Sequence, residues 1–94
     1  MKALHKNNDL RTCNAKTIVI GQSIVFCNGE LVSVEGDINT DGGGQLIGSC
    51  NVFINGLPVI IDGDSAFPDD LCQSEGHEHC LPSAVSYGNV FVGS

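Results

Sequence analysis

The chain has 94 residues, so a single domain (residues 1–94) is expected, with no room for a second hydrophobic core. Twelve glycines, one tyrosine and no tryptophan favour turns and short strands over packed helices, and the predicted fold class is all-β. The net charge is −7, and all four basic residues lie in the first sixteen. This charge argues against nucleic-acid binding, because a basic face is needed to displace counterions from phosphates. The acidic residues are expected to serve solubility.

No apolar run approaches the length of a transmembrane helix. The first nine residues lack the apolar stretch of a secretory signal, so synthesis in a cytoplasm is expected, where thiols stay reduced. Five cysteines are an odd number, which also argues against a closed disulfide framework. The thiols are then free to pack or to bind a metal.

An internal repeat is the most informative feature of the sequence. The segment Gly-Gln-Ser-Ile-Val-Phe-Cys-Asn-Gly at 21–29 returns as Gly-Ser-Cys-Asn-Val-Phe-Ile-Asn-Gly at 48–56. A third copy, Ser-Tyr-Gly-Asn-Val-Phe-Val-Gly-Ser, occupies 86–94. In the first two copies Asn-Gly separates two apolar runs, which is the strongest short signal for a two-residue hairpin turn. The predicted strands are 23–27 with 30–34, and 50–54 with 57–61.

The third copy stops at its turn, and the N-terminus is expected to supply the second strand of its hairpin. Each predicted hairpin ends at a Gly-Asp pair, at 36–37 and at 63–64, and Asn8-Asp9 stands in the corresponding place. We therefore predict that Met1–Lys6 pairs antiparallel with Asn89–Val92 and completes a third hairpin. Three such units around one axis make a small pseudo-threefold body in which neighbouring units cover the strand edges.

At these residues the sequence resembles the PAAR-repeat family, which caps the spikes of type VI secretion systems and contractile phage tails. The resemblance rests on the repeated Val-Phe-x-Asn-Gly followed by Gly-Asp, and it covers nearly the whole chain. The motif that names the family, Pro-Ala-Ala-Arg, reads Pro-Val-Ile-Ile at 58–61 and Leu-Val-Ser-Val at 31–34. Cys13 replaces the histidine that the family usually has four residues after the first Gly-Asp.

The resemblance implies a conical, pseudo-threefold β fold that sits on the blunt end of a trimeric β-helical spike, one copy per trimer. It implies a non-enzymatic tip that punctures membranes, contacts the target membrane transiently, forms no stable homo-oligomer and is made in the bacterial cytoplasm. The final location would be a virion tail tip or a secretion-system spike tip. The alternatives are a free zinc-binding adaptor and, less favoured, a zinc hydrolase that uses Glu75 or Glu78. A chain of this size has little volume for a substrate pocket.

One structural zinc is expected near the apex, as in the family. The candidate ligands are five residues of the first and third connections between hairpins, namely Cys13, Cys72, His77, His79 and Cys80. Four of these five suffice for tetrahedral zinc, and we favour the set without His79. Cys27 and Cys50 fall at positions where a small apolar side chain would pack, and His5 is expected at the surface.

The candidate partner-binding residues are Phe26, Phe53 and Phe91, which occupy the same place in each repeat. If they are exposed at the wide end of the body, they present one apolar surface three times, which suits a trimeric partner. The alternative interpretation is that the three phenylalanines fill the core.

Overall fold

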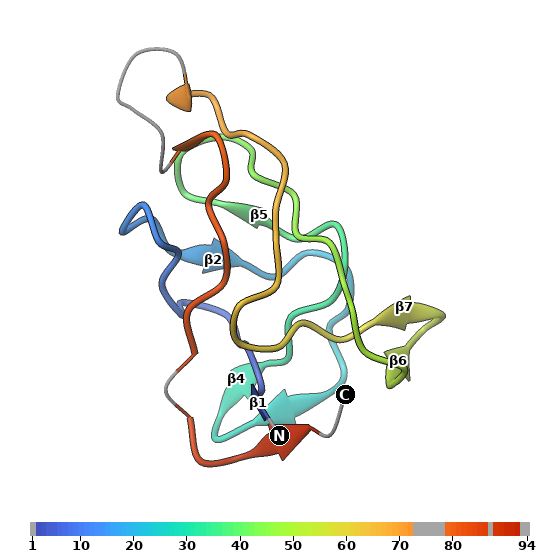
Figure 1. The fold of residues 1–94 in the computed structure, drawn as a ribbon. Helices are drawn as coiled ribbons and strands as arrows, with labels where there is room; N and C mark the ends of the chain where they lie inside the picture. Colours follow the sequence, from blue (N-terminus) through green and yellow to red (C-terminus); the bar gives the residue numbers. More distant parts are fainter. Residues whose placement is uncertain (1, 73–78, 87, 93–94) are drawn as a thin grey trace.

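The structure is a computed structural model that describes residues 2–72, 79–86 and 88–92. The all-β prediction is confirmed, because the elements within these residues are eight short strands in four antiparallel pairs (Figure 1). The pairs are β1 (Lys2–Ala3) with β8 (Phe91–Val92), β2 (Thr17–Ile18) with β5 (Ile38–Asn39), β3 (Phe26–Cys27) with β4 (Glu30–Leu31), and β6 (Phe53–Ile54) with β7 (Leu57–Pro58). No helix in the described part of the chain is long and apolar enough to span a membrane.

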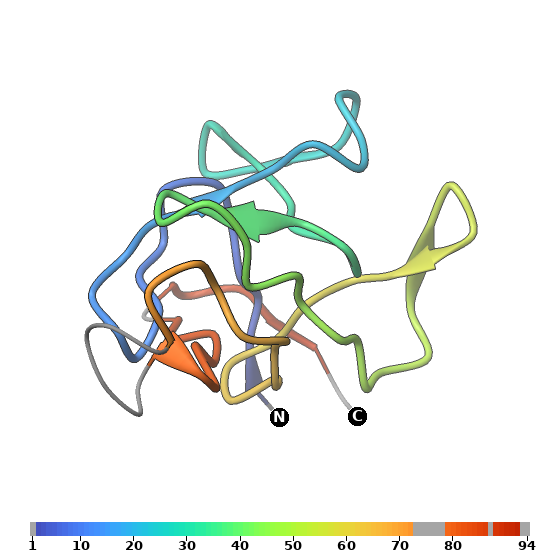
Figure 2. The same ribbon diagram turned by 90° about the horizontal axis from the view of Figure 1, so that it is seen from above.

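Two of the pairs are the hairpins that the Asn-Gly signals predict. In β3–β4, Asn28 and Gly29 have φ angles of 53° and 84°, and in β6–β7, Asn55 and Gly56 have 53° and 80°. Positive φ at both central residues defines a type I′ turn, whose twist matches that of the flanking strands. The structure therefore confirms both hairpins. Figure 2 shows them as separate arms that project from the body.

The strands are shorter than predicted because the chain soon leaves its own hairpin. Beyond β4, Val32 forms a bridge with Lys6, and Val34 forms one with Val59. Residues predicted to extend each hairpin therefore pair with a different repeat. This exchange of partners joins the three repeats into one body.

The N-terminal strand completes the third hairpin, as predicted. Lys2 pairs with Val92 and Ala3 with Phe91 in an antiparallel register. The amide of Leu4 continues the ladder by donating to the carbonyl of Val90 at 2.9 Å. The corresponding bonds of the other hairpins run from Val32 to Val25 and from Val59 to Val52.

A closed ring of backbone hydrogen bonds marks the pseudo-threefold axis. The His5 amide donates to Ile60 O at 2.9 Å, the Ile60 amide to Ser33 O at 2.9 Å, and the Ser33 amide to His5 O at 3.0 Å. These three residues hold equivalent positions in the three repeats, and each both donates to one neighbour and accepts from the other. The edges of the repeats are thereby satisfied without an outside strand.

The Gly-Asp pairs and Asn8-Asp9 form structural turns, so their aspartates have a role other than the solubility expected of the acids. Asp37 is fully buried, and its Oδ2 accepts a bond from the Val34 amide at 2.8 Å. The equivalent bonds of Asp9 and Asp64 measure 2.9 and 3.0 Å. The residue before each aspartate has a positive φ of 73°, 94° and 88°, at Asn8, Gly36 and Gly63 respectively. This conformation explains why asparagine can replace glycine at the first pair.

The buried apolar side chains form two clusters. One apolar cluster supports the hairpins and comprises Leu4, Val32, Val34, Cys50, Val59 and Ile61. Cys27 packs against this cluster, so the packing roles expected of Cys27 and Cys50 are confirmed. A smaller cluster comprises Leu46, Ile60, Ala66 and Ala84.

His5 is completely buried in this core, so the expectation of a surface position was wrong. Its Nδ1 lies 2.8 Å from Ser86 Oγ, and its Nε2 lies 2.7 Å from Thr17 Oγ1. Asp9 Oδ2 is 3.8 Å from Nδ1 and would favour a charged ring. Burial, and after it the positive charges of Arg11 and Lys6, outweigh this and lower the pKa of His5 to about 3. The ring is therefore neutral at physiological pH.

The three equivalent phenylalanines are exposed. The exposed fractions are 60% for Phe26, 56% for Phe53 and 52% for Phe91. The valines that precede them are also partly exposed, between 37% and 45%. The interpretation that the phenylalanines fill the core is therefore wrong.

Candidate metal centre

The three connections between hairpins meet at the end of the molecule away from the hairpins. In Figure 1 the hairpins lie toward the lower end, here called the hairpin end, and the connections gather toward the upper end, the connection end. A second ring of bridges holds the connections together and pairs Thr17 with Asn39, Leu46 with Ala66, and Arg11 with Ala84. Each bridge again joins two different repeats, so the threefold arrangement extends into this end.

Four side chains from all three connections form one cluster at the connection end. One ligand atom from each of Cys13, Asp41, Asp69 and His79 lies within 4.8 Å of all the others. His79 Nδ1 is 3.1 Å from Asp69 Oδ2 and 3.5 Å from Asp41 Oδ2, and Cys13 Sγ is 3.8 Å from Asp69 Oδ2. Ligands of a tetrahedral ion at bond lengths of 2.0–2.3 Å are about 3.3–3.8 Å apart. The cluster could therefore hold a metal ion.

The glycines that follow Asp41 allow the turn at 39–44 to pack closely against the segment at 68–70. A Cβ atom at Gly42 would lie 2.3 Å from Asp70 Oδ2, and one at Gly43 would lie 3.3 Å from the Asp69 backbone. A side chain at Gly43 would press on the Asp69 backbone, and one at Gly42 would strain a backbone φ of 86° and displace the Asp70 carboxylate. The glycines thus let two aspartate-bearing segments lie against each other.

Asp69 is the best supported member of the cluster. It is buried, and its Oδ2 accepts a hydrogen bond from Asn39 Nδ2 at 3.0 Å. The Leu71 amide donates to Oδ1 at 2.9 Å. Burial by itself would raise the pKa of Asp69, but the bonds from Leu71, His79 and Asn39 hold it below its ordinary value. The carboxylate is therefore ionised and fixed in direction, as a ligand should be.

Cys13 is the cluster residue that must lose a proton when a metal binds. Burial, together with the negative charges of Asp69 and Asp41, raises the pKa of its thiol. A metal ion binds the thiolate, so binding would release this proton. Metal affinity should therefore rise with pH in the neutral range.

A buried arginine sits beside the cluster and supplies positive charge. Arg11 is 1% exposed, and its guanidinium donates to the carbonyls of Gly44, Pro82 and Asp37 and to Thr17 Oγ1. Burial lowers its pKa to about 10, so it remains a cation at neutral pH. Together with a divalent ion, Arg11 would balance the charges of one thiolate and two carboxylates. The bonds to three carbonyls also tie the connections to one another.

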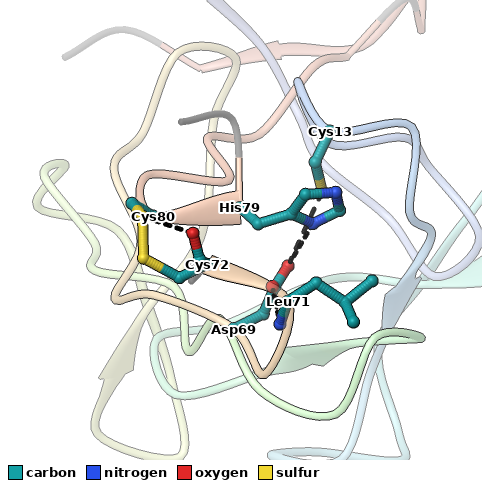
Figure 3. Close-up of a disulfide and its surroundings, with 6 residues drawn as sticks. All are labelled: Cys13, Asp69, Leu71, Cys72, His79 and Cys80. Atoms are coloured by element: carbon teal, nitrogen blue, oxygen red, sulfur yellow. Dashed lines mark hydrogen bonds and ion pairs between the residues drawn. A yellow bond between two sulfur atoms is a disulfide. The ribbon is translucent and has the colours of Figure 1, made fainter. Parts of the chain in front are cut away.

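The structure brings together two of the five predicted ligands, Cys13 and His79. Cys72 and Cys80 are joined to each other in a disulfide, whereas free thiols were expected (Figure 3). Disulfide sulfurs offer no thiolate, so in this form the pair does not provide the ligands expected of it. His77 lies outside the described residues. The set favoured from the sequence omitted His79, which lies in the cluster, and Asp41 adds the second connection to the first and third.

Sequence reasoning missed Asp41 and Asp69. Asp41 follows Asp37 by four residues, which is the position that Cys13 occupies after Asp9. Applying this position to the second repeat would have found it. In the third repeat the position is Pro68, and Asp69 comes directly after it. No local signal identifies Asp69.

The cluster is separate from a surface pocket of about 300 Å³ formed by described residues. This pocket is lined by Lys2, Ile47, Gly48, Ser49, Ile61, Gly63, Asp64 and Ser65. None of the four cluster residues is among them. Ser49 Oγ donates to Asp64 Oδ1 at the pocket wall, and this bond caps the Gly-Asp turn.

Comparison with known proteins adds no assignment: no family model matches the chain, and neither curated proteins nor solved structures show a significant match.

Proposed function

We propose that this protein is a non-enzymatic spike tip that caps a trimeric β-helical spike in a contractile injection machine of a phage tail or type VI secretion system. The observation that carries the proposal is the exposure of Phe26, Phe53 and Phe91 at equivalent positions of three hairpins around one axis. Large apolar side chains repeated in this way indicate an interaction surface. The repeat pattern that resembles the PAAR family supports the same conclusion.

Symmetry explains how one monomer can serve a trimer. A trimeric spike ends in three equivalent chains, and one copy of this protein offers each of them a nearly equivalent hairpin. Each phenylalanine would meet the same pocket or ledge on a different chain. A second copy would have no free binding position, which agrees with one tip per spike.

In this proposal the metal is a structural zinc held by Cys13, Asp41, Asp69 and His79. Zinc accepts sulfur, nitrogen and carboxylate oxygen in tetrahedral geometry. The ion would cross-link all three connections at the leading end, which meets the target membrane transiently. A structural metal adds its binding free energy to folding, so the tip resists unfolding under load.

Docking can be tested with a triple variant, Phe26→Asp, Phe53→Asp and Phe91→Asp. The spike trimer is first recovered from source cells by pull-down with the wild-type protein and identified by mass spectrometry. We expect one copy of the wild type per three spike chains, and at least a hundredfold weaker binding of the triple variant, because three carboxylates would be buried against apolar surface.

The matched control is Phe67→Asp. Phe67 is 57% exposed but lies on the third connection, outside the hairpins. This variant should bind the trimer as tightly as the wild type. Normal binding of the triple aspartate variant, with its fold and metal content intact, would rule out the cap.

A further inference from the structure

The Cys72–Cys80 disulfide lies between two members of the metal cluster. Cys72 follows Asp69 by three residues, and Cys80 follows His79 directly. The Cα atoms of the two cysteines are 4.5 Å apart, so the bond holds these two segments side by side (Figure 3). The disulfide therefore sits where it can fix the distance between Asp69 and His79.

Hydrogen bonds carry this constraint from the disulfide to the ligand atoms. The Cys72 amide donates to Asp69 O at 3.2 Å, and the Asp69 amide donates to His79 O at 2.8 Å. The side chains then meet, with His79 Nδ1 at 3.1 Å from Asp69 Oδ2. Backbone, side chains and the disulfide form one tight unit.

The other two ligands depend on different supports. Cys13 belongs to the first connection and Asp41 to the glycine turn of the second, and neither is covalently tied to the third connection. Opening the disulfide would leave these two in place and would loosen the link between Asp69 and His79. Reduction of the disulfide is therefore expected to affect the positions of Asp69 and His79 and to leave those of Cys13 and Asp41 unchanged.

We propose that the Cys72–Cys80 pair controls the metal affinity of the cluster, with the disulfide form binding the ion more tightly than the dithiol form. The inference depends on the metal centre of the proposed function. Without the cross-link, metal binding must order more backbone freedom around His79, and this entropy is lost from the binding free energy. We expect a loss of about tenfold, since ordering even one residue costs a factor of that order.

The opposite effect would follow if the cysteines were ligands. Reduction would then create two thiols, and their thiolates would offer zinc better donors than carboxylates. Metal affinity would rise on reduction. The sign of the change therefore separates a disulfide that positions ligands from cysteines that bind the ion.

Metal binding and disulfide reduction are thermodynamically linked, so the reduction potential provides a second, independent measurement. If oxidation raises metal affinity tenfold, then bound metal must make the disulfide tenfold harder to reduce. For a two-electron couple this is a change of about 30 mV to more negative potential. The pair is accessible enough for such titration, because both cysteines are only partly buried.

The experiment measures zinc affinity by competition with a chromophoric chelator, using the whole protein in both redox states. A phosphine reduces the disulfide: the phosphine takes oxygen from water and becomes the oxide, and the two electrons and two protons yield two thiols. We expect about tenfold weaker binding by the reduced wild type and by the double variant Cys72→Ser, Cys80→Ser. The reduction potential, measured against glutathione with and without zinc, should differ by about 30 mV.

The matched control is Cys27→Ser, which removes a thiol at the hairpin end. This variant should have the same zinc affinity as the wild type in the oxidised and in the reduced state. Equal or tighter binding by the reduced wild type would overturn the coupling. Absence of zinc binding in both redox states would remove the metal centre and the coupling together. Docking is proposed to use the hairpin end, so the outcome of the spike-binding test is independent of these zinc measurements.

Discussion

The two ends of this molecule use the same threefold repeat in different ways. At the hairpin end, the Val-Phe pair recurs in every repeat and places Phe26, Phe53 and Phe91 at equivalent positions. At the connection end, the position four residues after each repeated aspartate holds Cys13 in the first repeat and Asp41 in the second. The third repeat has proline there. The three repeats therefore carry the same residue at the phenylalanine position of the hairpin end and different residues at this position of the connection end.

The difference follows from what each end would bind. A trimeric partner presents three identical surfaces, so it favours three identical hairpins. A single tetrahedral ion needs four ligands, and a threefold repeat cannot provide four equivalent ones. The third connection is nearly twice as long as the others, and its extra length supplies His79. The longer connection thus breaks the symmetry where an ion would require it.

The largest expected effect is at the buried arginine of the connection end. Replacing Arg11 by methionine, Arg11→Met, should reduce the free energy of unfolding by about 3–5 kcal/mol, since each buried acceptor left unsatisfied costs ~1–3 kcal/mol. Urea denaturation measures the loss. The control Lys16→Met changes an exposed cation and should cost less than about 0.5 kcal/mol. Equal losses in the two variants would contradict this account of the connection end.

The next effect is the stabilisation by bound metal. Zinc at a hundred times its dissociation constant should stabilise the wild type by roughly 3 kcal/mol. The variant Asp69→Asn should lose most of this gain, because it replaces an anionic ligand that three groups hold in position. Thermal unfolding with and without zinc measures the difference.

The neighbouring residue provides the control for that variant. Asp70 is exposed, and Asp70→Asn should keep the full zinc response. If both variants responded to zinc like the wild type, Asp69 would not be a ligand.

A smaller effect is expected from pH. His5 has a folded-state pKa of about 3 against an ordinary value of 6.5, so the unfolded chain binds a proton first as pH falls. Stability is complete above pH 6.5 and is lost progressively as pH falls from there toward 3. About 2 kcal/mol should be lost by pH 5, since each pH unit below the unfolded-state pKa costs about 1.4 kcal/mol. Metal-free protein is used, and urea unfolding is compared at pH 7 and pH 5.

The variant His5→Gln isolates this contribution. It keeps a polar side chain between Ser86 and Thr17 but cannot gain the charge. Its stability at pH 7 should be lower than that of the wild type, and its loss between pH 7 and pH 5 should be smaller. An unchanged loss would assign the pH dependence to another group.

The smallest effect on stability is expected at the hairpin end. Changing Phe53 to serine removes a side chain that is 56% exposed and outside both core clusters. The free energy of unfolding should change by less than about 1 kcal/mol. A loss of several kcal/mol would mean that this phenylalanine supports the fold, and the hairpin end would no longer be a surface reserved for a partner.

Local chemistry made much of the hairpin end predictable. Asn-Gly at 28–29 and 55–56 specifies a turn because few other residues tolerate positive φ at two successive positions. The position of Asn8-Asp9 within the repeat was enough to predict the pairing of β1 with β8. These inferences need only the backbone preferences of adjacent residues and the comparison of one repeat with another.

The connection end depended on contacts between distant parts of the chain. The burial of His5, the approach of Asp41 to Asp69 and the pairing of Cys72 with Cys80 depend on how three connections of unequal length pack together. No backbone preference of a short segment encodes such distances. The sequence by itself therefore determined the hairpins, their order and their closure into a ring. Only the tertiary structure decided which side chains meet on the axis, because those contacts depend on the packing of all three repeats at once.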